Sequence, residues 1–95
     1  MSEIDDVILE YFFDTGRKHD FQTVLPPKTI WYNLTNVLEV IDRSPATVRR
    51  RMQKLDEMGL LEQLETTGTY YRITEKGVRY VEGDLTREEL SEPSD

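Results

Sequence analysis

Residues 44–73 constrain the fold most strongly, because a sharply bounded helix pattern there runs directly into a hairpin pattern. Ser44 followed by Pro45 is a typical helix start, with a serine N-cap before a proline in the first turn. Apolar residues then recur at helical spacing and a glycine follows them: Val48, Met52, Leu55 and Gly59. We therefore predict a helix over residues 45–58 that stops at the glycine.

Two short runs rich in β-forming residues, 60–65 and 69–73, flank a Thr-Thr-Gly segment and predict a β-hairpin. The pleat divides the second run into two faces, with Tyr71 and Ile73 on one and Tyr70 and Arg72 on the other. After the hairpin, Thr74 can cap a last helix over residues 75–83, which Gly83 ends and in which Val78, Val81 and then Leu85 face inward. Gly77, in the first turn of that helix, would permit close packing on the hairpin.

Helical periodicity also covers residues 3–14 and 27–38. The first helix carries acids in its first turn, where the helix dipole favours them, and Gly16 is its stop. The second begins at Pro26-Pro27 and places apolar residues on one face: Ile30, Leu34, Val37 and Leu38. Residues 15–25 are predicted as a loop. Residues 39–43 are predicted mostly as a turn, with an extension of the helix as the alternative.

The order helix, helix, helix, hairpin, helix defines the fold class. It is α+β and mostly helical, and a hairpin following three helices is the winged-helix arrangement of the helix-turn-helix. We expect one domain over residues 1–85. Residues 86–95 form a polar acidic tail that we expect to be flexible.

The charge of the chain is uneven. Nineteen acids and twelve bases give a formal charge of −7, which ordinarily argues against nucleic-acid binding. Residues 43–54 nevertheless hold five bases and no acid. Two interpretations follow: an acidic protein with no nucleic-acid role, or a protein adapted to concentrated salt, where long-range charge is screened and local charge matters more.

On a helical wheel, the predicted helix at 45–58 turns its basic residues away from the core. The outer face comprises Ala46, Arg49, Arg50, Gln53 and Lys54, with Thr47 beside it, while Asp56 and Glu57 come only in the last turn. The second helix of a helix-turn-helix enters the major groove with its N-terminal part. Arginine pairs with guanine and glutamine with adenine, so Arg49, Arg50 and Gln53 are expected at base edges. Arg43, Lys54 and, less centrally, Arg51 suit phosphates.

We interpret this surface as a binding site for double-stranded DNA rather than as a solvated helix face. The wing tip has no base of its own, and Glu62 and Glu65 would repel phosphate, so an ordinary tight hairpin is the alternative there. The predicted DNA-contacting residues are Arg43, Ser44, Ala46, Thr47, Arg49, Arg50, Gln53 and Lys54 from the helix and the turn before it, and Thr67, Tyr70 and Arg72 from the wing.

Three motifs carry a family resemblance. Ser44…Thr47-Val48, Leu55-x-x-x-Gly59-Leu60 and Tyr71-Arg72-Ile73-Thr74-x-Lys76-Gly77 resemble the winged-helix repressors, broadly of the MarR-like class. Over residues 3–85 the chain is most similar to small phage-repressor-like winged-helix proteins of halophilic archaea. The resemblance implies a transcriptional regulator, usually a repressor that binds a palindrome as a homodimer.

A homodimer is also expected because one helix offers few phosphate contacts, whereas two half-sites a helical turn apart give specificity. The first and last helices are the predicted interfaces, since the chain has more aromatic surface there than one small core needs: Tyr11, Phe12, Phe13 and Tyr80. Trp31 and Tyr32 are interpreted as core or dimer contacts, with part of an effector pocket as the alternative; whether an effector is sensed is left open.

Other functions have little support in the sequence. No cysteine is present, the lone His19 is interpreted as a surface residue, and the pairs Asp5-Asp6 and Glu88-Glu89 are expected to be solvated. We expect no enzymatic activity, metal or cofactor. The first residues lack the cations of a signal peptide and no apolar run approaches the about 20 residues of a membrane span, so a cytoplasmic location is expected. The alternative function is a protein-interaction module whose basic helix docks an acidic partner.

Overall fold

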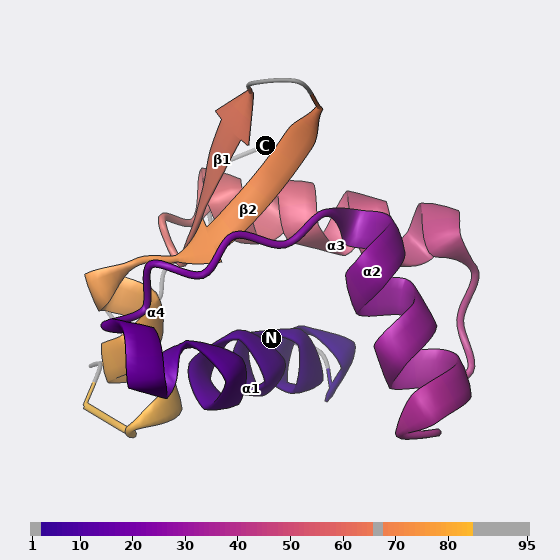
Figure 1. The fold of residues 1–95 in the computed structure, drawn as a ribbon, viewed down its shortest axis with the longest axis horizontal. Helices are drawn as coiled ribbons and strands as arrows, with labels where there is room; N and C mark the ends of the chain where they lie inside the picture. Colours follow the sequence, from indigo (N-terminus) through magenta and orange to yellow (C-terminus); the bar gives the residue numbers. More distant parts are fainter. Residues whose placement is uncertain (1–2, 66–67, 85–95) are drawn as a thin grey trace.

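The computed structural model describes residues 3–65 and 68–84. Its elements are α1 (Glu3–Gly16), η1 (Arg17–His19), α2 (Pro27–Tyr32), η2 (Asn33–Val37), α3 (Pro45–Glu57), β1 (Leu61–Glu65), β2 (Thr69–Ile73) and α4 (Glu75–Val81) (Figure 1). This order confirms the predicted α+β, mostly helical winged-helix fold. The predicted tail at 86–95, the inward-facing Leu85 and the wing-tip residue Thr67 lie outside the described residues.

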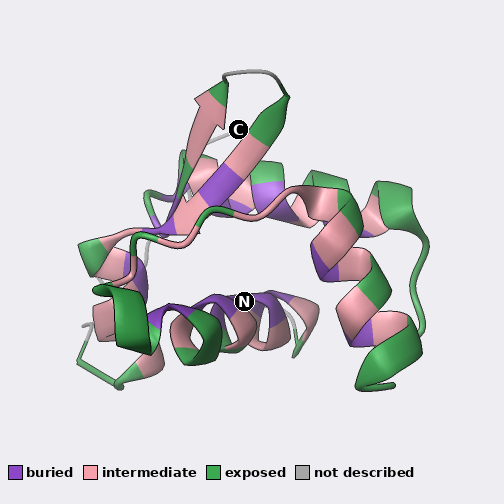
Figure 2. Ribbon diagram, in the orientation of Figure 1, coloured by how far each residue is buried: buried purple, intermediate pink, exposed green. Residues whose placement is uncertain are grey.

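The first three helices enclose one apolar core, which the hairpin and α4 close at one end (Figure 2). Helical spacing in α1 and α3 aligns their apolar side chains toward this core, as predicted. The fully buried apolar residues are Ile8, Leu9, Phe12, Ile30, Leu34, Val48, Met52, Leu55, Leu60, Leu61 and Tyr71. Each of the larger side chains contributes about 1.5–3 kcal/mol by leaving water.

The second helix departs from the predicted pattern at its C-terminal end. Ile30 and Leu34 are buried, but Val37 and Leu38, which were expected on the same buried face, are 59% and 52% exposed. In η2 the Leu38 amide donates to the Asn33 carbonyl at 2.8 Å, five residues back, so the turn is wider than in an α-helix. The prediction was wrong for these two residues because the wider turn breaks the 3.6-residue register. The helix ends there, and residues 39–43 form no helix, as predicted.

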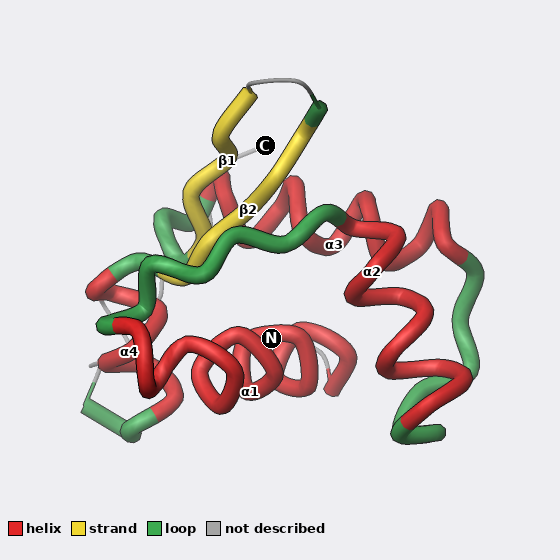
Figure 3. Tube along the Cα trace, in the orientation of Figure 1, coloured by secondary structure: helices red, strands yellow, loops and turns green. Residues whose placement is uncertain are grey.

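The segment predicted as a loop at 15–25 holds two features that the sequence pattern did not indicate. A short 3₁₀-helix, η1, follows α1 directly. Further along, the backbone of Leu25 pairs with that of Tyr71, through N–H···O bonds of 2.8 and 2.9 Å. The loop therefore runs beside β2 (Figure 3). A single paired residue just before two prolines leaves no periodicity from which such a bridge could be predicted.

The sequence Thr74-x-Lys76-Gly77 holds the C-terminal end of α3 to the start of α4. The Thr74 hydroxyl donates to the Gly59 carbonyl at 2.6 Å and accepts from the Gly77 amide at 3.0 Å. The Lys76 ammonium donates to the Met58 carbonyl at 3.0 Å. These bonds satisfy carbonyls that the helix end leaves without intrahelical partners. Gly59 itself has a φ of +80°, the left-handed conformation typical of a residue that ends a helix.

Aromatic residues of α1 and α4 are used inside the domain. Phe12 is buried in the core, and the Phe13 and Phe21 rings lie 5.4 Å apart. The Tyr80 hydroxyl donates a hydrogen bond to Asp6. Burial and then this hydrogen bond raise the pKa of Tyr80 to about 12. The prediction that Asp6 is merely solvated was therefore wrong, and Phe12, Phe13 and Tyr80 each have partners within the domain.

Gly77→Ala should destabilise the fold strongly. A Cβ at this position would overlap the Leu60 carbonyl oxygen and lie 2.6 Å from Ile73 Cγ1. We expect a loss of at least about 2 kcal/mol in the free energy of unfolding, measured by urea denaturation, because backbone must move to relieve the overlap. Gly83→Asn is the control, since no described atom lies within 4 Å of a Cβ there and asparagine tolerates its positive φ. Equal stability of the Gly77→Ala variant and the wild type would contradict this packing.

Candidate nucleic-acid interface

The N-terminal end of α3 is built by local hydrogen bonds. The Ser44 hydroxyl accepts from the Thr47 amide at 3.2 Å, and its oxygen lies 3.0 Å from the Thr47 hydroxyl. Pro45 occupies the first turn, as predicted. Before the helix, the Trp31 indole donates to the Arg43 carbonyl at 2.8 Å and ties the turn to α2. The start of α3 is thus fixed both by its own cap and by a side chain of the preceding helix.

The two faces of α3 separate as the wheel predicted. Val48, Met52 and Leu55 are fully buried. The outward residues Ala46, Arg49, Arg50 and Gln53 are exposed, as are Arg43 and Ser44, while Thr47 and Lys54 are half-buried. Within the described part of the chain, neither Arg49 nor Arg50 has an acidic ion-pair partner. Eight of the predicted contact residues therefore lie on one continuous surface formed by α3 and the turn before it.

Arg51 differs from its two neighbours. Its guanidinium binds the Asp5 carboxylate of α1 through both oxygens, with Nε 2.8 Å from Oδ1. The Asp5 side chain is 0% exposed and that of Arg51 is 30% exposed. The prediction that Asp5 is solvated was wrong, because burial beneath α3 requires a cationic partner. Arg51 therefore joins the two helices, while its expected contact with phosphate stays a prediction.

Asp5→Ala should destabilise the domain by about 2–3 kcal/mol, less than the about 3–5 kcal/mol typical of fully buried pairs because Arg51 is partly exposed. Chemical denaturation measures this loss. Asp14→Ala, which removes an exposed acid from the same helix, is the matched control and should stay within about 0.5 kcal/mol of the wild type. Similar small losses in both variants would show that the ion pair does not hold α1 to α3.

The predicted DNA contacts of the wing, Tyr70 and Arg72, are less available to DNA than those of α3. In the antiparallel hairpin Arg72 lies opposite Glu62, and its guanidinium binds that carboxylate at 2.8 and 3.0 Å and the Gln22 side-chain oxygen at 3.0 Å. Arg72 is the only base between residues 61 and 73. Tyr70 is half-buried, opposite Leu64. The charge of Arg72 is thus largely balanced within the wing, which weakens its attraction for phosphate.

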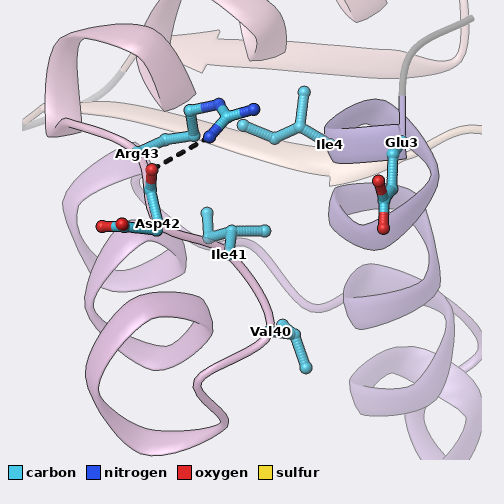
Figure 4. Close-up of a pocket in the computed structure, with 6 residues that line it drawn as sticks. All are labelled: Glu3, Ile4, Val40, Ile41, Asp42 and Arg43. Atoms are coloured by element: carbon cyan, nitrogen blue, oxygen red, sulfur yellow. Dashed lines mark hydrogen bonds between the residues drawn. The ribbon is translucent and has the colours of Figure 1, made fainter.

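A cleft separates the start of α1 from the turn that leads into α3. Its lining residues are Glu3, Ile4, Val40, Ile41, Asp42 and Arg43. Ile4 projects from α1 toward the turn that carries Ile41, and Arg43 donates to the Asp42 carbonyl at 3.1 Å (Figure 4). The Trp31 indole donates to the Arg43 carbonyl, and Tyr32 is 54% exposed. Neither aromatic residue lines this cleft.

Three helices with a capped basic helix as the third, followed by a β-hairpin, define a winged helix-turn-helix protein. Residues 1–93 match the model of the winged helix-turn-helix phage repressor family, and the chain belongs to this family of DNA-binding regulators. The predicted family resemblance is confirmed at this level, whereas the MarR-like and haloarchaeal likeness stays a prediction. A search of curated proteins and a search of solved structures each found no match. In the described residues no helix has the length and apolar character needed to cross a membrane.

Proposed function

We propose that the protein is a sequence-specific transcriptional repressor that inserts α3 into the major groove of double-stranded DNA. The observation that supports this most directly is the face of α3, where Ala46, Arg49, Arg50 and Gln53 are exposed together on a chain that is otherwise acidic. Arginine and glutamine side chains are suited to the major-groove edges of guanine and adenine. The order of charges along α3 adds support, because bases precede acids although the helix dipole favours the reverse.

The hairpin has a smaller part in this proposal. Arg72 is paired with Glu62, so the wing would graze the backbone through Tyr70 and uncharged groups rather than attract phosphate by charge. An acidic partner protein is the competing ligand for the basic face, and salt dependence alone does not separate it from DNA. Direct titration with both kinds of ligand does.

Arg49→Ala and Gln53→Ala should each weaken binding to a cognate duplex by about 1–3 kcal/mol and relax base preference. The cognate duplex is obtained by selection from a random library with the wild-type protein, and affinity is measured by fluorescence anisotropy over a series of salt concentrations. Lys18→Ala, which removes an exposed cation from η1, is the control and should leave both affinity and preference unchanged. A wild-type protein that binds an acidic peptide but no duplex at any salt concentration would establish the competing function.

We also propose that the repressor acts as a homodimer, because two recognition helices on a palindrome double the contact set of one small domain. The exposed apolar side chains support an interface at the end of the second helix rather than on α1 and α4. Tyr32, Val37, Leu38 and Val40 are each more than half exposed and follow one another closely in the chain. Apolar side chains gathered in this way are typical of protein interfaces. These four residues all precede Ser44 in the chain, whereas the exposed face of α3 begins at Ala46, so the proposed dimer interface and the proposed DNA surface use different residues.

Leu38→Asp should convert the dimer to a monomer at tens of micromolar in sedimentation equilibrium, because a buried unpaired carboxylate is strongly unfavourable. Val24→Asp is the matched control, since Val24 is an exposed valine outside this group and should leave the dimer intact. A wild-type protein that sediments only as a monomer would refute the proposed dimer. A dimer unaffected by Leu38→Asp would place the interface elsewhere.

A further inference from the structure

The exposed surface of α3 contains a hollow on one of its flanks. Thr47, Arg50, Arg51 and Lys54 line it. They are spaced at i, i+3, i+4 and i+7 and therefore form one ridge along the helix. Three of the four side chains are cationic and the fourth carries a hydroxyl, so every lining side chain can donate hydrogen bonds to an anion.

Three of the four lining side chains, Thr47, Arg50 and Arg51, contact neighbouring side chains. The Arg50 Nη2 lies 3.5 Å from the Thr47 hydroxyl oxygen, and that oxygen lies 3.0 Å from the Ser44 hydroxyl. On the inner side, the bidentate bond to buried Asp5 fixes the plane of the Arg51 guanidinium. A site held in this way loses less side-chain entropy on binding than a set of freely rotating cations.

The lining of the hollow suits an anion. The hollow is lined by Arg50, Arg51 and Lys54 together with Thr47, and no acid is among these lining residues, although the Asp5 carboxylate binds Arg51 from beneath. The acids of α3, Asp56 and Glu57, come after the lining residues in the chain. A phosphodiester carries one negative charge and acceptor oxygens, which matches these donors.

We propose that this hollow binds one backbone phosphate of the DNA. This proposal rests on the DNA-binding function proposed above. Arg50 then contacts phosphate instead of a base edge, which revises its role as expected from the sequence. Ala46, Arg49 and Gln53, spaced at i, i+3 and i+7, form the adjacent ridge and face the bases. Asp5 is a positioning residue, because it acts on the phosphate only through Arg51.

Arg50→Ala and Arg49→Ala form a matched pair for the test, since each removes one exposed arginine from the same helix. Two probes are used, the selected cognate duplex and a random-sequence duplex of the same length. Arg50→Ala should weaken binding to both by the same factor, at least about fivefold, and lower the slope of log K against log salt by about one. Arg49→Ala should lower the ratio of cognate to random affinity.

Single methylphosphonates, which replace one charged phosphate by a neutral group, then locate the contact. One position in each half-site should weaken the wild-type protein but have no effect on the double variant Arg50→Ala/Lys54→Ala. Loss of base preference in Arg50→Ala would overturn the proposed phosphate contact while leaving the DNA-binding function intact. The same conclusion would follow if the double variant were weakened as much as the wild type by a methylphosphonate at every position. Absence of duplex binding by the wild type would overturn both.

Discussion

The bond between Asp5 and Arg51 is the contact on which the arrangement of this domain depends. It joins the first turn of α1 to the middle of α3, across 46 positions of sequence. A fully buried carboxylate is tolerated only when a cation and hydrogen bonds compensate its lost hydration. Any rotation of α3 about its axis would break this bond. The pair thus fixes which side chains of α3 face outward, in addition to holding two helices together.

Several acidic residues of the chain have structural partners in the folded domain. Asp5 and Asp6 are not part of a solvated surface, because one binds Arg51 and the other accepts the Tyr80 hydroxyl. Glu62 balances Arg72 in the wing. Acids therefore neutralise cations at the edges of the interface, while Arg49 and Arg50 keep their charge on its exposed face. Arg49 and Arg50 are thus exposed on the face that we propose binds DNA.

Much of this fold could be predicted from the sequence, and the reason is local. The Ser44-Pro45 start, the Gly59 stop and the Thr74 cap each act within a few residues, and the structure confirms all three. The outward face of α3 followed from helical period alone. The hairpin and its two faces followed from alternation. The wider turn of η2 was not predictable in this way, and Val37 and Leu38 are exposed as a result.

The sequence by itself determined the order of the elements, the faces of α3 and the basic character of its first two turns, because caps and periodicity act over distances of one or two turns. Only the tertiary structure decided what each cation does. Arg49, Arg50 and Arg51 are consecutive and chemically identical, yet one is bound to a carboxylate of α1 and the others are exposed. From the sequence, Arg72 was an equally good candidate for DNA contact, but in the folded domain it binds Glu62 and Gln22. The role of a charged side chain depends on partners distant in sequence, and only packing brings those partners together.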